Sequence, residues 1–180
     1  PDSSYNSSFT LSFDFKLDEN SGTAYQYMYS HGTWNATNSL QIHVGESGNS
    51  TDANVLKTAF GDSNDTFSSS ALNTNIASLI GDGQWHTYTL VVDKANGSQV
   101  YIDGALRTTA ASCGGDAFDP TGSLYLGSRS DLNSTQFFGG DLDTVRIFDR
   151  ALSATEVSSL NTGASPSATS AQSTAMAYVT

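Results

Sequence analysis

A strict alternation of apolar and polar residues over residues 8–17 is the feature that most limits the fold of this chain. The apolar members are Phe9, Leu11, Phe13, Phe15 and Leu17, and polar residues stand between them. A two-residue period places all of these apolar side chains on one face of an extended strand. Strands with one buried and one more polar face are typical of antiparallel sheets, so we expect a β-rich fold.

Further segments of the same kind follow along the chain, separated by clusters of turn-forming residues. The predicted strands cover 24–30, 39–45, 54–61, 86–93, 98–104, 123–128 and 141–149. Asp103-Gly104 predicts a two-residue hairpin turn, because both central positions of a type I′ turn need a positive φ. Regularly spaced short strands of this kind predict an all-β fold, an antiparallel two-sheet jelly-roll sandwich.

One short helix is predicted near the C-terminal end. Ser153 and Glu156 have the spacing of a capping box, in which each residue satisfies a backbone N–H of the other. Val157 and Leu160 supply a short apolar face, and Gly163 is a typical helix stop. We expect about two helical turns between these signals.

Charge and cysteine content exclude several classes of function. The chain has 180 residues, typical of one domain, with 18 acidic against 7 basic residues and a formal net charge of −11. This excess of negative charge argues against binding to nucleic acids or to anionic lipid surfaces. The single cysteine, Cys113, cannot form a disulfide within the chain. Because the chain opens at Pro1, we expect a mature, processed protein or an excised domain.

Asn-x-Ser/Thr sequons occur six times, more often than the composition alone predicts, and all fall in turn-like stretches. They lie at Asn6, Asn35, Asn49, Asn64, Asn96 and Asn133. N-linked glycans must be exposed, so this distribution favours a secreted or cell-surface glycoprotein whose sequons are occupied. Accidental sequons in a Ser/Thr-rich secreted protein are the alternative.

An aromatic stripe is the first candidate binding surface. Tyr25, Tyr27 and Tyr29 alternate along one predicted strand, and Trp34 follows in a stretch rich in Gly and Asn. Aromatic faces stack on sugar rings, so these four residues are candidate glycan contacts. The alternative is that the stripe is the core side of its strand.

The histidines give no sign of catalysis. Trp85-His86 begins a predicted strand without an accompanying nucleophile or carboxylate pattern, so we expect Trp85 to pack at the edge of the sandwich and His86 to be a polar strand residue. His31 and His43 lack the spacing of metal ligands.

Two ordered signatures resemble the laminin-G-like and concanavalin-A-like jelly-roll family. Residues 81–104, GDGQWHTYTLVVDKANGSQVYIDG, resemble the central signature, and residues 137–157, FFGGDLDTVRIFDRALSATEV, resemble the closing one. Their order and spacing agree with the family over residues 8–160. The resemblance implies a jelly roll that serves in glycan binding, in adhesion or as a module appended to a hydrolase.

The resemblance also implies a calcium site or a backbone clamp at Asp143. This residue is in phase with Val145 and Ile147, so its carboxylate should point to the buried side of the strand and need a partner. Asp141 and Asp14 are the candidates to join it around a structural calcium ion, which takes hard oxygen ligands. Hydrogen bonds to backbone N–H groups are the alternative.

Glycosidases with a related sandwich carry a Glu-x-Asp-x-x-Glu strand, whose carboxylates flank the scissile bond. The chain has glutamate only at Glu19, Glu46 and Glu156, so this strand is absent from the sequence. We therefore expect no hydrolase activity.

Residues 164–180 differ in composition from the 1–163 domain. They are mostly Ala, Ser and Thr and carry no charge, which by itself predicts a solvated tail or a mucin-like stalk. We expect the tail to lie extended and to add as a strand to an edge of the fold, with Tyr178 and Val179 as anchors. Pairing within one chain leaves a monomer, whereas pairing with the next copy gives a head-to-tail filament.

The sequence therefore predicts a non-enzymatic extracellular structural or adhesive glycoprotein, a homo-oligomer or homopolymer assembled through its tail. The alternatives are a calcium-dependent carbohydrate-binding module with a glycan ligand and an accessory domain of a glycoside hydrolase. Neither nucleic acid nor a membrane span belongs to any of these hypotheses.

Overall fold

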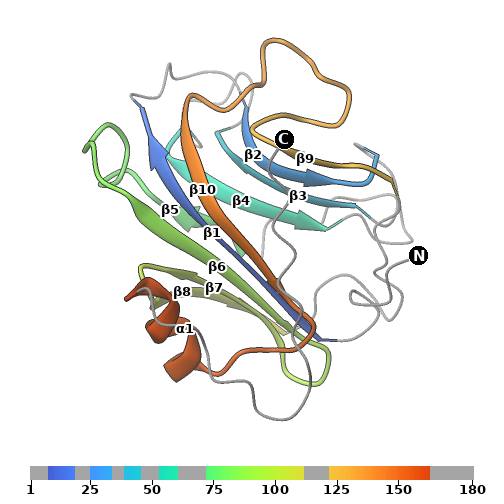
Figure 1. Ribbon diagram of the computed structural model, residues 1–180, viewed down its shortest axis with the longest axis vertical. Coiled ribbons are helices and arrows are strands. Elements are labelled where there is room, and N and C mark those ends of the chain that lie inside the picture. Colours follow the sequence, from blue (N-terminus) through green and yellow to red (C-terminus); the bar gives the residue numbers. More distant parts are fainter. Residues whose placement is uncertain are drawn as a thin grey trace.

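The computed structural model describes residues 8–18, 25–33, 39–45, 53–60, 72–111 and 122–162, which form two antiparallel sheets and one helix (Figure 1). In spatial order, sheet A contains β10 (Gly140–Phe148), β1 (Phe9–Leu17), β6 (His86–Asp93), β7 (Gly97–Ile102) and β8 (Ala105–Ala110). Sheet B contains β5 (Thr74–Asn75), β4 (Val55–Phe60), β3 (Leu40–Val44), β2 (Gln26–His31) and β9 (Leu124–Leu126). The jelly-roll sandwich predicted from the sequence is confirmed.

The strands lie where their apolar patterns predict them. Each predicted strand is present, with its ends displaced by no more than two residues. The hairpin turn is also confirmed, since Asp103 and Gly104 have φ values of 54° and 73° and connect β7 to β8. The tail at 164–180, with its predicted anchors Tyr178 and Val179, lies outside the described residues, as does Gly163.

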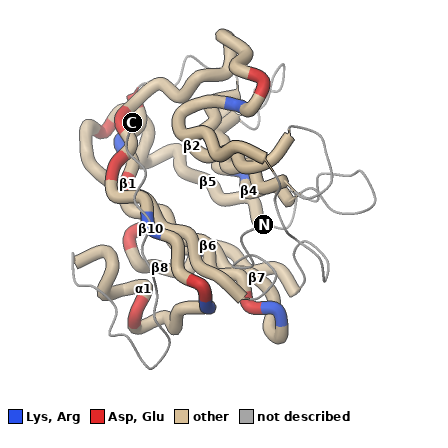
Figure 2. The backbone as a smooth tube through the Cα atoms, turned by 45° about the vertical axis from the view of Figure 1, so that its right-hand side comes forward, with Lys and Arg blue, Asp and Glu red and all other residues tan. Residues whose placement is uncertain are grey.

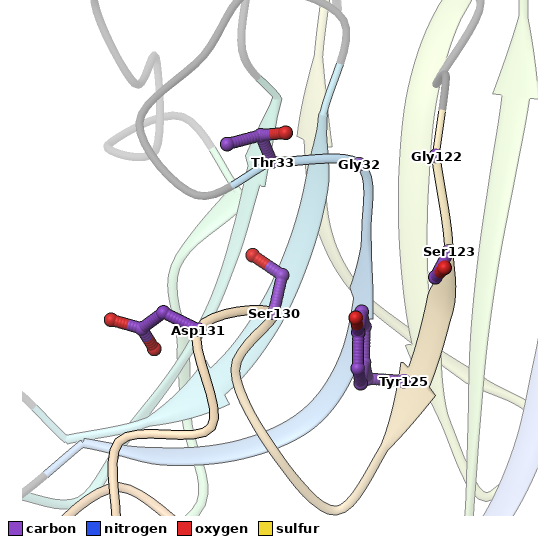
Figure 3. A pocket seen from close by; sticks show the side chains of 7 residues that line it. All are labelled: Gly32, Thr33, Gly122, Ser123, Tyr125, Ser130 and Asp131. Carbon is purple, nitrogen blue, oxygen red and sulfur yellow. The ribbon is translucent and has the colours of Figure 1, made fainter.

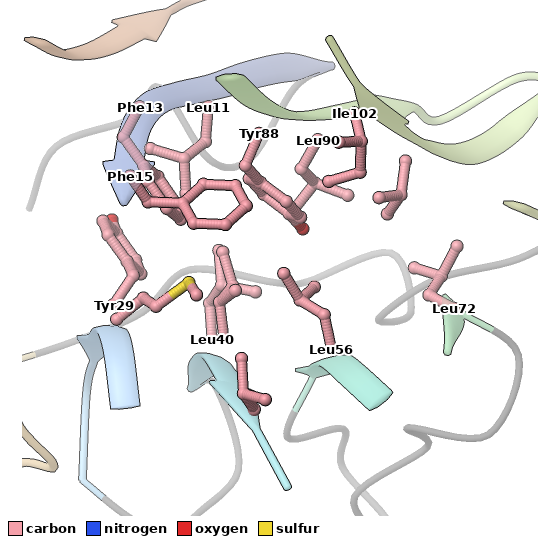
Figure 4. Packing of buried hydrophobic residues seen from close by; sticks show 14 of the residues in the cluster. Leu11, Phe13, Phe15, Tyr29, Leu40, Leu56, Leu72, Tyr88, Leu90 and Ile102 are labelled. Carbon is pink, nitrogen blue, oxygen red and sulfur yellow. The ribbon is translucent and has the colours of Figure 1, made fainter. Parts of the chain in front are cut away.

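The main core fills the space between the two sheets, and it is closed by aromatic side chains from sheet A (Figure 4). Phe13 on β1 stacks on Tyr88 of β6 with 4.9 Å between ring centroids. The hydroxyl of Tyr88 lies 2.6 Å from the Thr58 hydroxyl of β4, so one buried hydrogen bond joins the sheets. Leu40 and Leu56 meet these rings from sheet B (Figure 4).

Helix α1 (Ala154–Asn161) covers the outer face of sheet A. Its capping box is formed as predicted, because the Ser153 hydroxyl accepts the N–H of Glu156 while the Glu156 carboxylate accepts the N–H of Ser153. Val157 and Leu160 are buried in a second apolar cluster with Val91 of β6. The two-residue apolar face of this helix is therefore enough to cover part of the sheet.

A bulge in β10 reverses the phase of its side chains. Thr144 has a φ of 50°, and the pairing of β1 with β10 shifts register at this point. Consequently Leu142 and Val145, three residues apart, both pack against the core. Asp143 is exposed and its Oδ1 accepts the Thr144 N–H at 2.7 Å. The prediction that Asp143 points to the buried side is wrong, because it assumed an unbroken two-residue period.

Candidate functional site

A pocket of about 240 Å³ opens beside β9, at one edge of sheet B. It is lined by the residues that follow β2, by β9 with the two residues before it, and by the loop after β9. The lining residues are Gly32, Thr33, Gly122, Ser123, Tyr125, Ser130 and Asp131 (Figure 3). In this view Ser130 stands between Asp131 and the ring of Tyr125, so the pocket combines an aromatic side chain, hydroxyls and one carboxylate.

The loop after β9 holds its shape through hydrogen bonds from nearby backbone N–H groups to its own side chains. Asp131 Oδ1 accepts the N–H of Asn133 at 3.2 Å, and Asn133 Oδ1 accepts the N–H of Thr135 at 3.1 Å. Side-chain turns of this kind favour one loop conformation, in which a backbone group is satisfied by a residue two positions earlier. The Asp131 carboxylate is therefore presented from a pre-formed loop.

Arg129 holds the Asp131 carboxylate in place with two hydrogen bonds. Its Nε donates to Asp131 Oδ1 at 2.8 Å and its Nη2 donates to Oδ2 at 2.5 Å. The Arg129 side chain is 8% exposed, and its guanidinium lies 5.9 Å from the ring centroid of Tyr27. The hydrogen bonds from Arg129 hold the pKa of Asp131 below its usual value, so this carboxylate is ionised at neutral pH.

This arrangement suits a small ligand that is rich in hydroxyl groups. Pockets for drug-sized ligands occupy roughly 300–1,000 Å³, so a pocket of about 240 Å³ fits one sugar ring better than a long chain. The carboxylate accepts hydroxyl protons, the Ser and Thr hydroxyls donate or accept, and the Tyr125 ring offers a face for C–H groups. Nothing in this set of groups supplies a nucleophile activated by a base.

The predicted aromatic stripe does not form one surface. The register between β2 and β3 shifts between Tyr27 and Tyr29, so Met28 and Tyr29 both face the core. Tyr27 is 3% exposed and packs on the ring of His43 at 4.8 Å, and Tyr25 is half-buried beside it. The prediction that Tyr27 and Tyr29 present a glycan platform is wrong because both rings are buried, whereas Trp34 lies outside the described residues.

The three carboxylates of the predicted calcium site turn to different partners. Asp14 accepts the hydroxyl proton of Thr87 at 2.7 Å, and Asp141 pairs with Lys16 at 2.5 Å. Together with the exposed Asp143, they form no cluster, and the described residues contain no group of three His, Cys, Asp or Glu side chains placed to hold a metal ion. The structural calcium ion stays a prediction, and the described residues do not supply a set of ligands for it.

His86 joins two loops rather than lying alone on its strand. Its Nδ1 is 2.8 Å from Asp103 Oδ2 in the β7–β8 turn, and its Nε2 is 3.0 Å from Asp82 Oδ2. Burial lowers the pKa of His86, but hydrogen bonds and charge interactions with Asp103 and Asp82 outweigh this and raise it overall. Trp85 beside it is 49% exposed and lies under the Lys16 ammonium, rather than packing at the sandwich edge as predicted.

Two of the six sequons lie among the described residues, and both asparagines are in turns. Asn96 is exposed between β6 and β7, and its amide donates to Asp93 at 2.6 Å. Asn133 is partly exposed and lies in the loop beside the pocket. The other four, Asn6, Asn35, Asn49 and Asn64, lie outside the described residues, as does Cys113.

Sequence reasoning missed Tyr125, Asp131 and Arg129. Tyr125 belongs to a predicted strand, but that strand is only three residues long, too short for its apolar pattern to reveal which face is buried. The spacing Arg-x-Asp-x-Asn in this loop was a usable signal, because Asp and Asn favour side-chain turns. It could not show that the loop approaches Thr33.

Two antiparallel sheets packed as a jelly roll give this chain the fold of lectin-like domains. A laminin-G family model, which represents the concanavalin A-like lectin/glucanase superfamily, matches residues 1–158 of the chain. The chain therefore belongs to this family. Among curated protein sequences, none matches the chain. No helix in the described residues is long and apolar enough to cross a membrane.

Solved structures with the same fold are distant in sequence. A heptameric SAP-like pentraxin from Limulus polyphemus is similar with a TM-score of 0.62 and 20% identity, over 86% of this chain and 69% of that one. A Bacteroides ovatus protein to which carbohydrate binding has been provisionally assigned has a TM-score of 0.63 and 17% identity, over 88% of this chain and 42% of that one. The receptor-binding domain of botulinum neurotoxin type G has a TM-score of 0.62 and 16% identity, over 86% of this chain and only 38% of that one. These likenesses support the fold alone.

Proposed function

We propose that this domain is a non-catalytic carbohydrate-binding module of an extracellular protein, with its ligand in the pocket beside β9. The observation that carries the proposal is the meeting of Tyr125, Asp131 and several hydroxyls in one sugar-sized pocket. Membership of the concanavalin A-like lectin/glucanase superfamily supports it. Domains of this superfamily are commonly extracellular, which agrees with the predicted sequons.

Glycan-array screening followed by calorimetric titration tests this function. The Tyr125→Ala variant should bind the array ligand at least about tenfold more weakly, because the ring is the one aromatic side chain among the described lining residues. Trp85→Ala is the matched control, since Trp85 is also an exposed aromatic residue but belongs to the start of sheet A. Absence of any glycan ligand, or equal affinity of the Tyr125 variant, would contradict the proposal.

The domain has no catalytic role in this proposal. Glu156 is committed to the capping box and to Arg150, whose Nη2 is 2.6 Å from its carboxylate. The acid–base groups that do meet, His86 with Asp82 and Asp103, tie a turn to a strand. Hydrolysis of a polysaccharide by the purified domain, abolished by Asp103→Asn, would overturn this assignment.

A structural or adhesive role through tail-mediated assembly is the second candidate. The position of β8 as the last strand of sheet A among the described residues favours it, because this strand reads ALRTTA, is largely exposed and carries one charged residue, Arg107. Edge strands of this kind accept a further strand, and an uncharged tail offers free N–H groups. The opposite edge, β10, carries Asp141 and Asp143 and a bulge, which disfavour strand addition.

Light scattering of the full chain and of a chain lacking residues 164–180 tests this assembly. The full chain should form head-to-tail homopolymers, and the shortened chain should be a folded monomer. Replacing Thr109 of β8 by proline is the matched edge variant, since it removes an N–H from a sheet edge. Assembly that survives both changes would contradict a tail-strand mechanism.

Calcium dependence is proposed as a property to test in the same assays. Chelation should lower the melting temperature of the full chain and weaken glycan binding if a calcium ion is structural. An unchanged melting temperature and affinity would remove calcium from the proposal. Intact-mass measurement before and after glycosidase treatment of native material tests the predicted glycosylation in parallel.

A further inference from the structure

We propose that the pocket beside β9 selects neutral sugars over sugars that carry a carboxylate or a sulfate, and that the Arg129–Asp131 pair sets this preference. The inference rests on the proposed carbohydrate-binding function and names its ligand class. It follows from which charges at the pocket are available to a ligand and which are already used.

The basic group nearest the pocket is not available to an anionic ligand. Two nitrogen atoms of Arg129 already donate to the two oxygens of Asp131, at 2.8 and 2.5 Å. The Arg129 side chain is 8% exposed, its guanidinium lies 5.9 Å from the Tyr27 ring centroid, and it is not among the described residues that line the pocket. A planar guanidinium that is already paired in this two-point manner is poorly placed to hold a second anion.

The carboxylate itself is available. The Asp131 side chain is 44% exposed and lines the pocket, and the hydrogen bonds from Arg129 lower its pKa and so keep it ionised. An ionised carboxylate is an acceptor only, so it favours ligand groups that donate, such as sugar hydroxyls. It repels a ligand carboxylate or sulfate placed in the same pocket, where water screens the charges less than in bulk.

The remaining lining residues offer an anion no compensation. Apart from Asp131, the lining residues that the structure describes are glycine, serine, threonine and tyrosine, with no lysine or arginine among them. The few basic residues of the described chain are spread over several elements (Figure 2). The formal net charge of −11 adds a weaker repulsion, which salt screens beyond a Debye length of about 8 Å.

Arg129 is therefore a positioning residue. It orients the carboxylate toward the ligand without touching the ligand itself, and Tyr27 in turn holds Arg129. Its role differs from that of Tyr125, whose loss should weaken every sugar alike.

Matched oligosaccharide pairs test the charge preference directly. The probes are oligosaccharides that end in glucose or in glucuronate, and in galactose or in galacturonate, each titrated into the full chain. For the pair that binds, we expect the neutral oligosaccharide to bind at least about tenfold more tightly than the anionic one at low salt. This affinity ratio should fall as the salt concentration is raised. The Asp131→Asn variant should reduce the ratio at least about threefold. Asp149→Asn, an equal charge change at an exposed residue between β10 and α1, should leave it unchanged.

A gain-of-function variant keeps the test informative if the loop of Asp131→Asn is perturbed. Thr33 is exposed at the pocket rim, so Thr33→Lys adds a free cation without touching the loop. This variant should bind the glucuronate-ended probe more tightly than wild type does. Glycan binding that depends on Tyr125 but favours the anionic member would overturn the charge preference and leave the proposed function standing. No glycan binding at all would overturn both.

Discussion

The outer faces of the two sheets differ in how their buried groups are satisfied. On sheet A, Val91 and Tyr101 are covered by apolar residues of α1 and the segment before it, and the buried hydroxyls of Thr10, Ser12 and Thr89 are hydrogen-bonded. On sheet B, several outward positions of β2, β3 and β4 are polar and still buried, namely Ser30, Gln41, His43 and Lys57. The first face contributes to stability by apolar burial, whereas buried polar groups stabilise only when they are paired.

These buried polar positions of sheet B are therefore less stabilising than apolar side chains would be at the same places. Gln41 Nε2 and His43 Nδ1 are buried and have no hydrogen-bond partner among the described residues. Sheet B is also the sheet whose edge carries the candidate pocket. Sheet B thus carries both the unpaired buried polar groups and the proposed binding pocket, whereas the apolar cover of α1 belongs to sheet A.

The largest expected effect is on the apolar cover of sheet A. Leu160→Ala should lower the free energy of unfolding by about 2–4 kcal/mol, because it leaves a cavity between α1 and the sheet. Glycan affinity should not change, since the pocket belongs to sheet B. Urea unfolding measures the first effect, and exposed Thr155→Ala on the same helix is the control. A loss of glycan binding in folded Leu160→Ala would break the division of roles.

His43 should make sheet B sensitive to acid. Burial, followed by the charge of Lys57, lowers the pKa of His43 from its ordinary value of 6.5 to about 4. Only the unfolded state binds the proton between these values, so stability falls as the pH drops through this range. Wild type should lose about 2–3 kcal/mol more than His43→Gln between pH 7 and pH 4. Parallel pH profiles of the two proteins would contradict burial of a neutral His43.

The hydrogen bond between the sheets should have a smaller effect. Tyr88→Phe removes the partner of the buried Thr58 hydroxyl and should destabilise by about 1–2 kcal/mol. Combining it with Thr58→Val should cost less than the sum of the two single changes, because no hydroxyl is then left unpaired. Strict additivity in this double-mutant cycle would show that the two hydroxyls do not interact.

His86 on sheet A should respond to pH in the opposite direction. Its pKa is raised in the folded state, so its contribution is complete below the unfolded pKa of about 6.5 and is lost as pH rises through the folded pKa. The contribution of these partly exposed pairs should be about 0.5–1 kcal/mol. Melting temperatures of wild type and His86→Gln should differ at pH 6 and converge at pH 9. A gap that widens with pH would contradict the bridge to Asp82 and Asp103.

The smallest effect is expected at the residue that the sequence pattern places wrongly. Asp143 is exposed, and its carboxylate accepts the N–H of Thr144 in its own bulge. Asp143→Ala should change the free energy of unfolding by less than about 0.5 kcal/mol. A loss of 1 kcal/mol or more, or a chelation effect that disappears in this variant, would restore the calcium hypothesis at this position.

The sequence by itself determines the strands, the hairpin and the helix of this protein, because each rests on neighbours along the chain. The alternation in β1, the Asp103-Gly104 turn and the Ser153–Glu156 capping box all depend on residues within a few positions of one another. Local periodicity fixes such elements before any distant contact forms.

Only the tertiary structure decides which side of a bulged strand is buried and where the pocket lies. The extra residues near Thr144 in β10 and Met28 in β2 reverse the alternation, which moves Asp143 outward and Tyr29 inward. A bulge of one residue leaves no clear mark on composition but exchanges the faces of every residue beyond it. The pocket joins Thr33 to Asp131, almost a hundred positions later, because β9 pairs with β2. Contacts of that range are set by strand order, which a local pattern does not encode.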